Sequence, residues 1–112
     1  MTTGNLYADL TDLAAGETFD DLWRQGHLRI ERILSSAQPE PVLYLQEQDE
    51  WVLLLEGQAL LEVNGERINL VAGDYLLIPA RTPHRVLATH PDPRCLWLAV
   101  HLYPSTTPAT EA

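Results

Sequence analysis

The feature that most constrains the fold is an Asn-Gly dipeptide at residues 64–65, set in the segment LLEVNGERINL. Apolar and polar residues alternate on both sides of it, as they do in a strand with one buried face. Asn-Gly suits a two-residue type I′ turn, whose central residues both need positive φ. The sequence therefore predicts a β-hairpin centred on this dipeptide.

Short strand-like runs recur along the rest of the chain, and turn signals separate them. Gly73-Asp74 marks one tight connection and HPDPR, at residues 90–94, marks another. The predicted strands are 27–35, 42–46, 51–55, 59–63, 67–70, 75–78, 85–89 and 94–103. Many short strands at regular spacing favour an all-β fold, an antiparallel sandwich or barrel.

The N-terminal segment has helix-like signals instead of strand-like runs. Thr18 followed by Asp21 resembles a helix N-cap and first turn, and FDDLW has the length of about two helical turns before Gly26. We therefore expect an N-terminal arm with a short helix over residues 1–26. A β-barrel over 27–103 and a disordered polar tail over 104–112 complete the expected single domain.

Charge and composition exclude several classes of partner. The 112 residues carry a formal net charge of −9, and all seven cationic residues are Arg. Nucleic acids and anionic membrane surfaces both require basic protein surfaces, so neither is an expected partner. The N-terminal residues lack the features of a signal peptide, and the apolar runs are too short to cross a membrane. With Cys95 as the single cysteine, we expect a reducing, cytoplasmic setting.

Two spaced motifs lie between Glu50 and His84. In the first, six residues separate Glu50 from Gly57; in the second, five separate Gly73 from Pro79, and His84 follows five positions later. Fifteen residues lie between the two glycines. In these motifs the chain resembles the cupins, in particular the small single-domain bacterial proteins of the cupin 2 conserved-barrel family.

The resemblance covers roughly residues 40–103. It implies a jelly-roll-like β-barrel with a ligand pocket inside, and usually a homodimer. Metal-binding cupins carry His-x-His upstream of the motif Glu, and here those positions hold Tyr44 and Gln46. Arg81 replaces the usual motif Gly, and Ala88 the usual Asn. Of the four usual ligands, only the Glu and the His of the two motifs remain.

We expect the four aligned residues, Tyr44, Gln46, Glu50 and His84, all to point inward, because side chains alternate along a strand. Two strong ligands and an amide oxygen would hold a divalent ion weakly, and imidazole and carboxylate suit Zn, Fe, Mn or Ni. Alternatively, Glu50 and His84 hydrogen-bond to each other within a metal-free polar network. A buried carboxylate needs a partner in either case.

Three functions follow from this set. The first is a small-molecule-binding protein with a polar pocket built on Tyr44, Gln46, Glu50 and His84. The second is a metal-dependent dioxygenase, isomerase or lyase acting on a small polar acid, with Glu50, His84 and Gln46 as ligands and Tyr44 as proton donor. The third is a metal-free isomerase or lyase in which Glu50 and His84 form an acid–base pair.

Other residues are weaker candidates. Arg81 precedes His84 and would reach a carboxylate or phosphate at the pocket mouth, or else lie on the surface beside an acid. His101 shares strand parity with Trp97, and we expect it to serve packing or an interface. Trp51 should point outward, toward a dimer contact. Cys95 is expected to be a buried apolar residue.

Overall fold

The computed structural model describes residues 1, 3–40, 42–91 and 94–104, and this part of the chain contains eight strands and no helix. No helix that could span a membrane is found among these residues. The strands are β1 (Glu17–Gln25), β2 (Leu28–Ser35), β3 (Asp49–Glu56), β4 (Gln58–Val63), β5 (Glu66–Val71), β6 (Tyr75–Ile78), β7 (His84–His90) and β8 (Cys95–Leu102).

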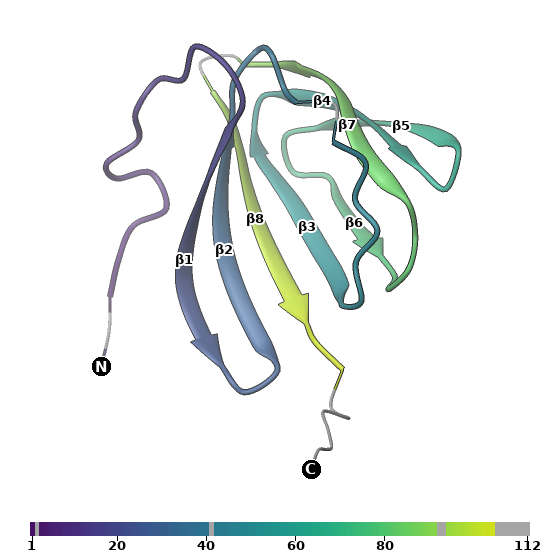
Figure 1. Ribbon diagram of the computed structural model, residues 1–112. Helices are drawn as coiled ribbons and strands as arrows, with labels where there is room; N and C mark the ends of the chain where they lie inside the picture. The colour runs from purple at the N-terminus through teal and green to yellow at the C-terminus, as the bar shows by residue number, and fades with distance from the viewer. Residues whose placement is uncertain (2, 41, 92–93, 105–112) are drawn as a thin grey trace.

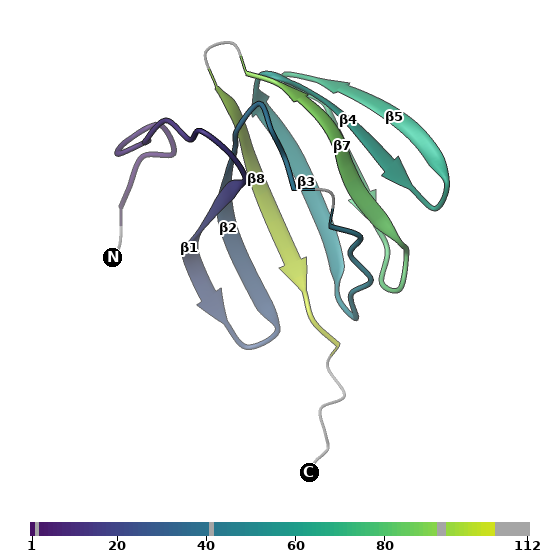
Figure 2. The same cartoon turned by 45° about the horizontal axis from the view of Figure 1, so that its top comes forward.

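The strands form two antiparallel sheets that face each other and make the wall of a β-barrel (Figures 1 and 2). One sheet has the order β1-β2-β8-β3-β6, and the other has the order β5-β4-β7. The all-β prediction is confirmed. The predicted hairpin is also present: β4 pairs with β5 up to Val63 opposite Glu66, and Asn64 and Gly65 both have positive φ, as a type I′ turn requires.

The predicted N-terminal helix is wrong, because residues 17–25 form β1 and pair with β2. Gly26, interpreted as a helix stop, lies instead in the turn of this hairpin, with a φ of 58°. The acidic residues that suggested a helix start pair across the hairpin with arginines. Asp21 lies 2.6 Å from Arg29, and Asp20 lies 2.9 Å from Arg32. Cross-strand charge pairs thus use the same residues that would favour a helix N-terminus.

The predicted strand at 42–46 is also wrong. In that segment Tyr44 alone is bridged, to His84, by two backbone hydrogen bonds of 2.8 and 3.0 Å. The chain here crosses from β2 to β3 and is bridged to β7 at Tyr44 (Figure 1). Alternation is therefore not what orients its side chains. Residues 105–112 of the predicted tail lie outside the described part of the chain.

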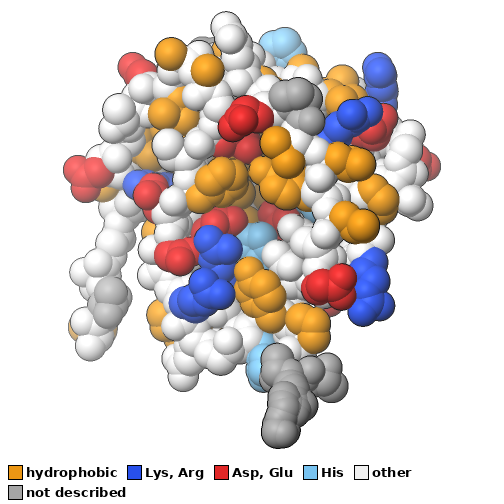
Figure 3. All heavy atoms as spheres, viewed as in Figure 1, with side chains coloured by type: hydrophobic (Ala, Val, Ile, Leu, Met, Phe, Trp, Pro, Cys, Tyr) orange, Lys and Arg blue, Asp and Glu red, His pale blue; other side chains and the backbone are white. Residues whose placement is uncertain are grey.

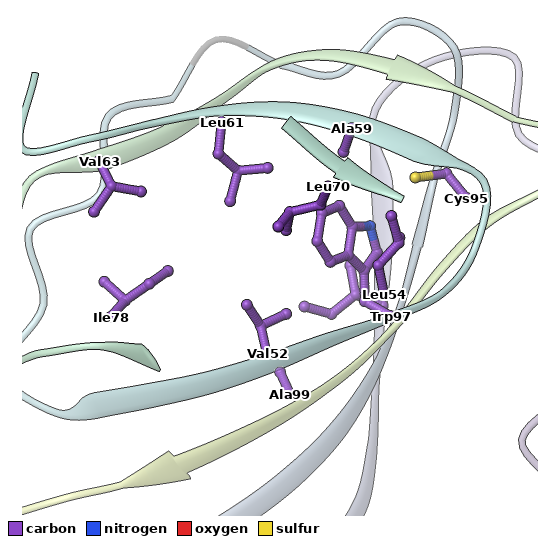
Figure 4. Close-up of a cluster of buried hydrophobic side chains, with 11 residues drawn as sticks. Val52, Leu54, Ala59, Leu61, Val63, Leu70, Ile78, Cys95, Trp97 and Ala99 are labelled. Atoms are coloured by element: carbon purple, nitrogen blue, oxygen red, sulfur yellow. The ribbon is translucent and has the colours of Figure 1, made fainter. Parts of the chain in front are cut away.

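The core lies between the two sheets (Figure 4). Leu54 and Cys95 are fully buried there, as expected for this cysteine. Burial raises the pKa of the Cys95 thiol to about 12, so the thiol stays protonated at neutral pH and is no nucleophile.

The inward-facing residues change from apolar to polar along the strands. On β3 they run from Leu54 to Glu50, and on β8 from Trp97 to His101. The register places Glu50 directly opposite His101, so the two polar residues lie at the same end of the interior. We call this region, formed by Glu31, Glu50, His84 and His101, the polar end.

Gly57 is the single residue between β3 of one sheet and β4 of the other. Its φ is 89°, which disfavours residues with a side chain. A Cβ at this position would lie 2.5 Å from the carbonyl oxygen of Arg94 and 2.9 Å from Cα of Cys95. The backbone at Gly57 therefore passes so close to the start of β8 that only glycine fits.

On the edge strand β1, Glu17 is joined to the core by hydrogen bonds. The indole of Trp97 donates to the Ser35 hydroxyl at 3.0 Å, and that hydroxyl donates to the Glu17 carboxylate. Burial raises the pKa of Glu17 above its ordinary value, and the Ser35 hydrogen bond offsets this only in part.

We expect Gly57→Ala to destabilise the protein more than Gly73→Ala, by about 1–3 kcal/mol. Both glycines have positive φ, but a Cβ at Gly73 meets nothing within 4 Å, whereas at Gly57 it meets backbone atoms. Urea denaturation of the two variants measures the difference. Equal losses would contradict the close approach of Gly57 to the backbone of Arg94 and Cys95.

We expect Glu17→Gln to stabilise the protein near pH 7 and to do so less as the pH falls. The folded pKa of Glu17 is raised, so between the ordinary value of 4.5 and that higher value the folded state binds more protons than the unfolded state. Its contribution to stability is therefore lost as the pH rises through this window. Glutamine has no charge to bury and still accepts the Ser35 hydrogen bond.

Denaturation at about pH 7 and about pH 4 tests this prediction, with the exposed Glu66→Gln as control. A gain in the free energy of unfolding that does not depend on pH would refute it.

Candidate functional site

A cavity of about 100 Å³ lies between the two sheets and includes the polar end. One part of its lining is apolar: Phe19, Ile33, Val52, Leu61, Ile78, Val86 and Trp97. The other part is polar: Glu17, Glu31, Tyr44, Gln46, Glu50, His84, Arg85 and His101. In Figure 3, acidic and histidine side chains lie in a hollow near the middle of the face shown, with hydrophobic side chains beside them.

Glu50 and His84 face each other across this cavity. The two residues are 8% and 7% exposed, and Nε2 of His84 lies 3.8 Å from Oε1 of Glu50. The other ring nitrogen, Nδ1, lies 2.9 Å from the backbone carbonyl oxygen of Thr82, to which it can only donate. In the neutral ring, Nε2 then carries a lone pair that points toward the cavity.

Gln46 and Tyr44 complete the group. The side-chain amide of Gln46 donates to Oε1 of Glu50 at 2.9 Å. The Tyr44 ring stacks on the His84 ring, with centroids 5.6 Å apart. Burial, followed by the charge of Glu17, raises the pKa of the Tyr44 phenol, so this side chain keeps its proton and stays a hydrogen-bond donor at neutral pH.

The structure thus brings four of the five predicted site residues together in one cavity, but not Arg81. Arg81 lies on an outer groove, where its exposed side chain pairs with Glu47 at 3.0 Å. Its backbone N–H donates to the carbonyl oxygen of Gln46 at 2.7 Å. The position of Arg81 agrees with a surface arginine beside an acid and argues against a ligand contact at the cavity mouth.

The sequence interpretation missed Glu17, Glu31 and His101 as cavity residues. Nε2 of His101 donates to Glu31 at 2.7 Å, and Nδ1 lies 3.3 Å from the Gln48 side-chain amide. Arg29 pairs with the second oxygen of Glu31 at 2.9 Å. Both nitrogens of His101 therefore have partners, which gives it the role of a buried structural group.

Strand parity was the signal that could have identified Glu31 and His101 as cavity residues. His101 shares parity with Trp97, and Glu31 shares parity with Ile33; all four side chains face inward. Our preference for His101 in packing or an interface placed it outside the cavity, which it in fact lines. Glu17 gave no such signal, since it lay within the predicted N-terminal arm.

The residues present fit a tightly held catalytic metal ion poorly. Within the part of the chain that the structure describes, no group of three His, Cys, Asp or Glu side chains could hold one. Glu50 and His84 are two strong ligands, but the Gln46 amide turns its NH₂ toward Glu50 and the Tyr44 phenol keeps its proton. We therefore derive no chemistry through a resident metal.

Comparison with solved structures supports the fold. A protein from Ralstonia eutropha JMP134, named provisionally as a mannose-6-phosphate isomerase, is 38% identical over 93% of this chain and all of its own, with a TM-score of 0.83. A conserved protein of unknown function from Streptococcus pyogenes is 19% identical over 94% of this chain and 90% of its own, with a TM-score of 0.78.

Quercetin 2,3-dioxygenase of Bacillus subtilis is 43% identical over 44 residues, which are 39% of this chain and 13% of that enzyme. The chain thus matches only a small part of the dioxygenase's length. The sequence pattern of the cupin domain matches residues 34–101, more than half of the chain. The chain therefore belongs to the cupin family.

Proposed function

We propose that this cupin binds a small molecule in the cavity between its sheets, and that Tyr44, Gln46, Glu50 and His84 hold it. The observation that carries this proposal is the buried Nε2 of His84. It faces Glu50 at 3.8 Å, beyond hydrogen-bond distance. A buried polar atom without a partner costs free energy, and a ligand that donates hydrogen bonds would remove that cost.

The second candidate is a metal-free isomerase or lyase in which Glu50 and His84 act as acid and base. His84 favours it, because its Nδ1 is engaged by the Thr82 carbonyl while its Nε2 faces Glu50 in the cavity. The Ralstonia protein, with its provisional isomerase name, makes an isomerisation the first reaction to test. A binding protein and an isomerase would share the same ligand contacts.

A metal-dependent enzyme is the third candidate, with one divalent ion (Zn, Fe, Mn or Ni) on Glu50, His84 and Gln46. The hydrogen bond from His84 Nδ1 to a backbone carbonyl supports it, since metal-binding histidines are usually oriented in this way. The position of the Gln46 amide weighs against it.

A homodimer is also part of the proposal. β1 is an edge strand of its sheet and exposes Phe19, Leu22 and Trp23, each by more than 40%. Trp51, which we expected to point toward a dimer contact, is half-buried and packs against Tyr75 with ring centroids 5.7 Å apart. The exposed aromatic residues on β1 are therefore better candidates for the contact.

We expect His84→Ala to destabilise the protein by about 1–3 kcal/mol, because it removes the hydrogen bond to Thr82 and the stacking on Tyr44. His90→Ala, which removes an exposed histidine at the end of the same strand, is the control and should cost less than about 0.5 kcal/mol. Urea denaturation measures both. Equal stabilities of His84→Ala and wild type would contradict a buried, bonded His84.

Elemental analysis of protein purified without chelator separates the candidates. We expect less than one metal ion per chain in the wild type, because only two strong ligands are present. One ion per chain that is lost in both Glu50→Gln and His84→Ala would instead establish the metal enzyme.

Gel filtration of the same sample tests the dimer, and a monomer at micromolar concentration would refute it.

A further inference from the structure

The charges around the cavity are unevenly compensated. Three carboxylates line it, and Glu31 is bonded to both Arg29 and His101. Glu17 and Glu50 have no arginine within salt-bridge distance among the described residues. The cavity therefore carries an excess of negative charge.

The positive charges of the chain are committed elsewhere. Arg85 is the one cationic side chain in the described cavity lining, and its Nε lies 2.8 Å from the Glu62 carboxylate. Arg81 and Arg94 pair with acids outside the cavity, and Arg24 lies over the Tyr103 ring. An anionic ligand would find no free guanidinium among these residues, which weighs against the small polar acid expected from the sequence.

His84 provides a second, independent observation. Its side chain is 9% exposed, and Nε2 is an acceptor in the neutral ring because Nδ1 donates to Thr82. The group that Nε2 faces, Glu50, is an acceptor too, at 3.8 Å. In the neutral ring the two acceptors thus face each other, and a donor with at least two N–H or O–H groups would satisfy both.

The pKa directions agree with a surplus of negative charge. Burial raises the pKa of both Glu17 and Tyr44, and the charges of other glutamates raise both further. A positive charge in the cavity would oppose that effect. No comparable surplus of positive charge is found around the described cavity.

We propose that the ligand is a small organic cation, a protonated amine on a compact apolar body. The ammonium group would donate to Glu50 and His84, with the charge of Glu17 facing the same cavity. The apolar body would contact residues such as Val52 and Trp97. This rests on the proposed function, because it requires that the cavity bind a small molecule. A divalent ion would be a poorer occupant, since it would face only two strong ligands and an apolar wall.

The test compares three probes of similar size and different charge: n-butylammonium, n-butanol and butyrate. Each is titrated into ¹⁵N-labelled full-length protein at constant ionic strength with EDTA present, and chemical shifts report the site and the affinity. We expect butylammonium to bind most tightly and to shift the amides of the cavity residues. Glu50→Gln should weaken it about tenfold, the scale of one charge-assisted hydrogen bond.

Two further variants keep the test independent of the folding of Glu50→Gln. Glu17→Gln should weaken butylammonium by about threefold, because it removes a charge that faces the cavity without a direct ammonium contact. Glu66→Gln removes the same charge from an exposed position on β5 and should leave the affinity unchanged within about twofold. Equal weakening in all three variants would mean general attraction to an acidic protein and would overturn the proposal.

The remaining outcomes separate this inference from the function on which it rests. If butanol or butyrate binds in the cavity as tightly as butylammonium, the preference for cations is wrong while the binding function stands. If none of the probes shifts cavity amides at tens of millimolar, both are wrong. If added Zn²⁺ or Mn²⁺, tested without EDTA, raises the melting temperature and butylammonium does not, the occupant is a metal ion and the organic cation is overturned.

Discussion

The backbone at Gly57 is the constraint on which the rest of the barrel depends. The chain leaves one sheet at the end of β3 and enters the other at the start of β4, with this residue alone between them. So short a connection fixes the position of β4 relative to β3, and the β4 register then fixes β7. Val63 on β4 pairs with His84, while β3 carries Glu50. The distance between the two central residues of the site is thus set by a glycine at the far end of the strands.

The barrel interior changes in polarity along β3 and β8. Apolar side chains lie around Leu54 and Trp97 at one end, and Val63 and Ile78 extend the apolar core into the other end. Carboxylates and histidines lie at the polar end, where they stabilise the barrel less but can take part in binding or proton transfer. The polar end has two histidine–carboxylate pairs. His101 is hydrogen-bonded to Glu31 at 2.7 Å, whereas His84 and Glu50 are 3.8 Å apart, beyond hydrogen-bond distance. The first pair thus stabilises the barrel, and the second is the pair to which we assign the ligand in our proposal.

Much of the fold could be predicted from local patterns. The Asn-Gly turn and the alternation around it are short-range signals, and seven of the eight strands overlap predicted ones. β1 was missed because Thr18, Asp21 and Gly26 satisfy helix-end rules locally, while their actual partners lie on β2. Cross-strand partners such as Arg29 and Arg32 are a tertiary effect that single-segment patterns do not contain.

The candidate site was predictable to a different degree. Tyr44, Gln46, Glu50 and His84 were placed by the resemblance to the cupin motifs, and all four line the cavity. The partners of His84 and the second histidine pair depend on strand register, which composition and spacing leave open.

The single bridge between Tyr44 and His84 has a consequence for how this barrel can change over time. Residues 42–48 carry the cavity residues Tyr44 and Gln46 yet belong to no strand ladder, since their backbone is bonded to the barrel through Tyr44 and through the Gln46 carbonyl to Arg81. Substitutions, insertions or deletions in this segment need not preserve alternation or register, as they must within a sheet. This segment is therefore an exchangeable part, through which a lineage could acquire a new ligand preference while the eight strands stay as they are.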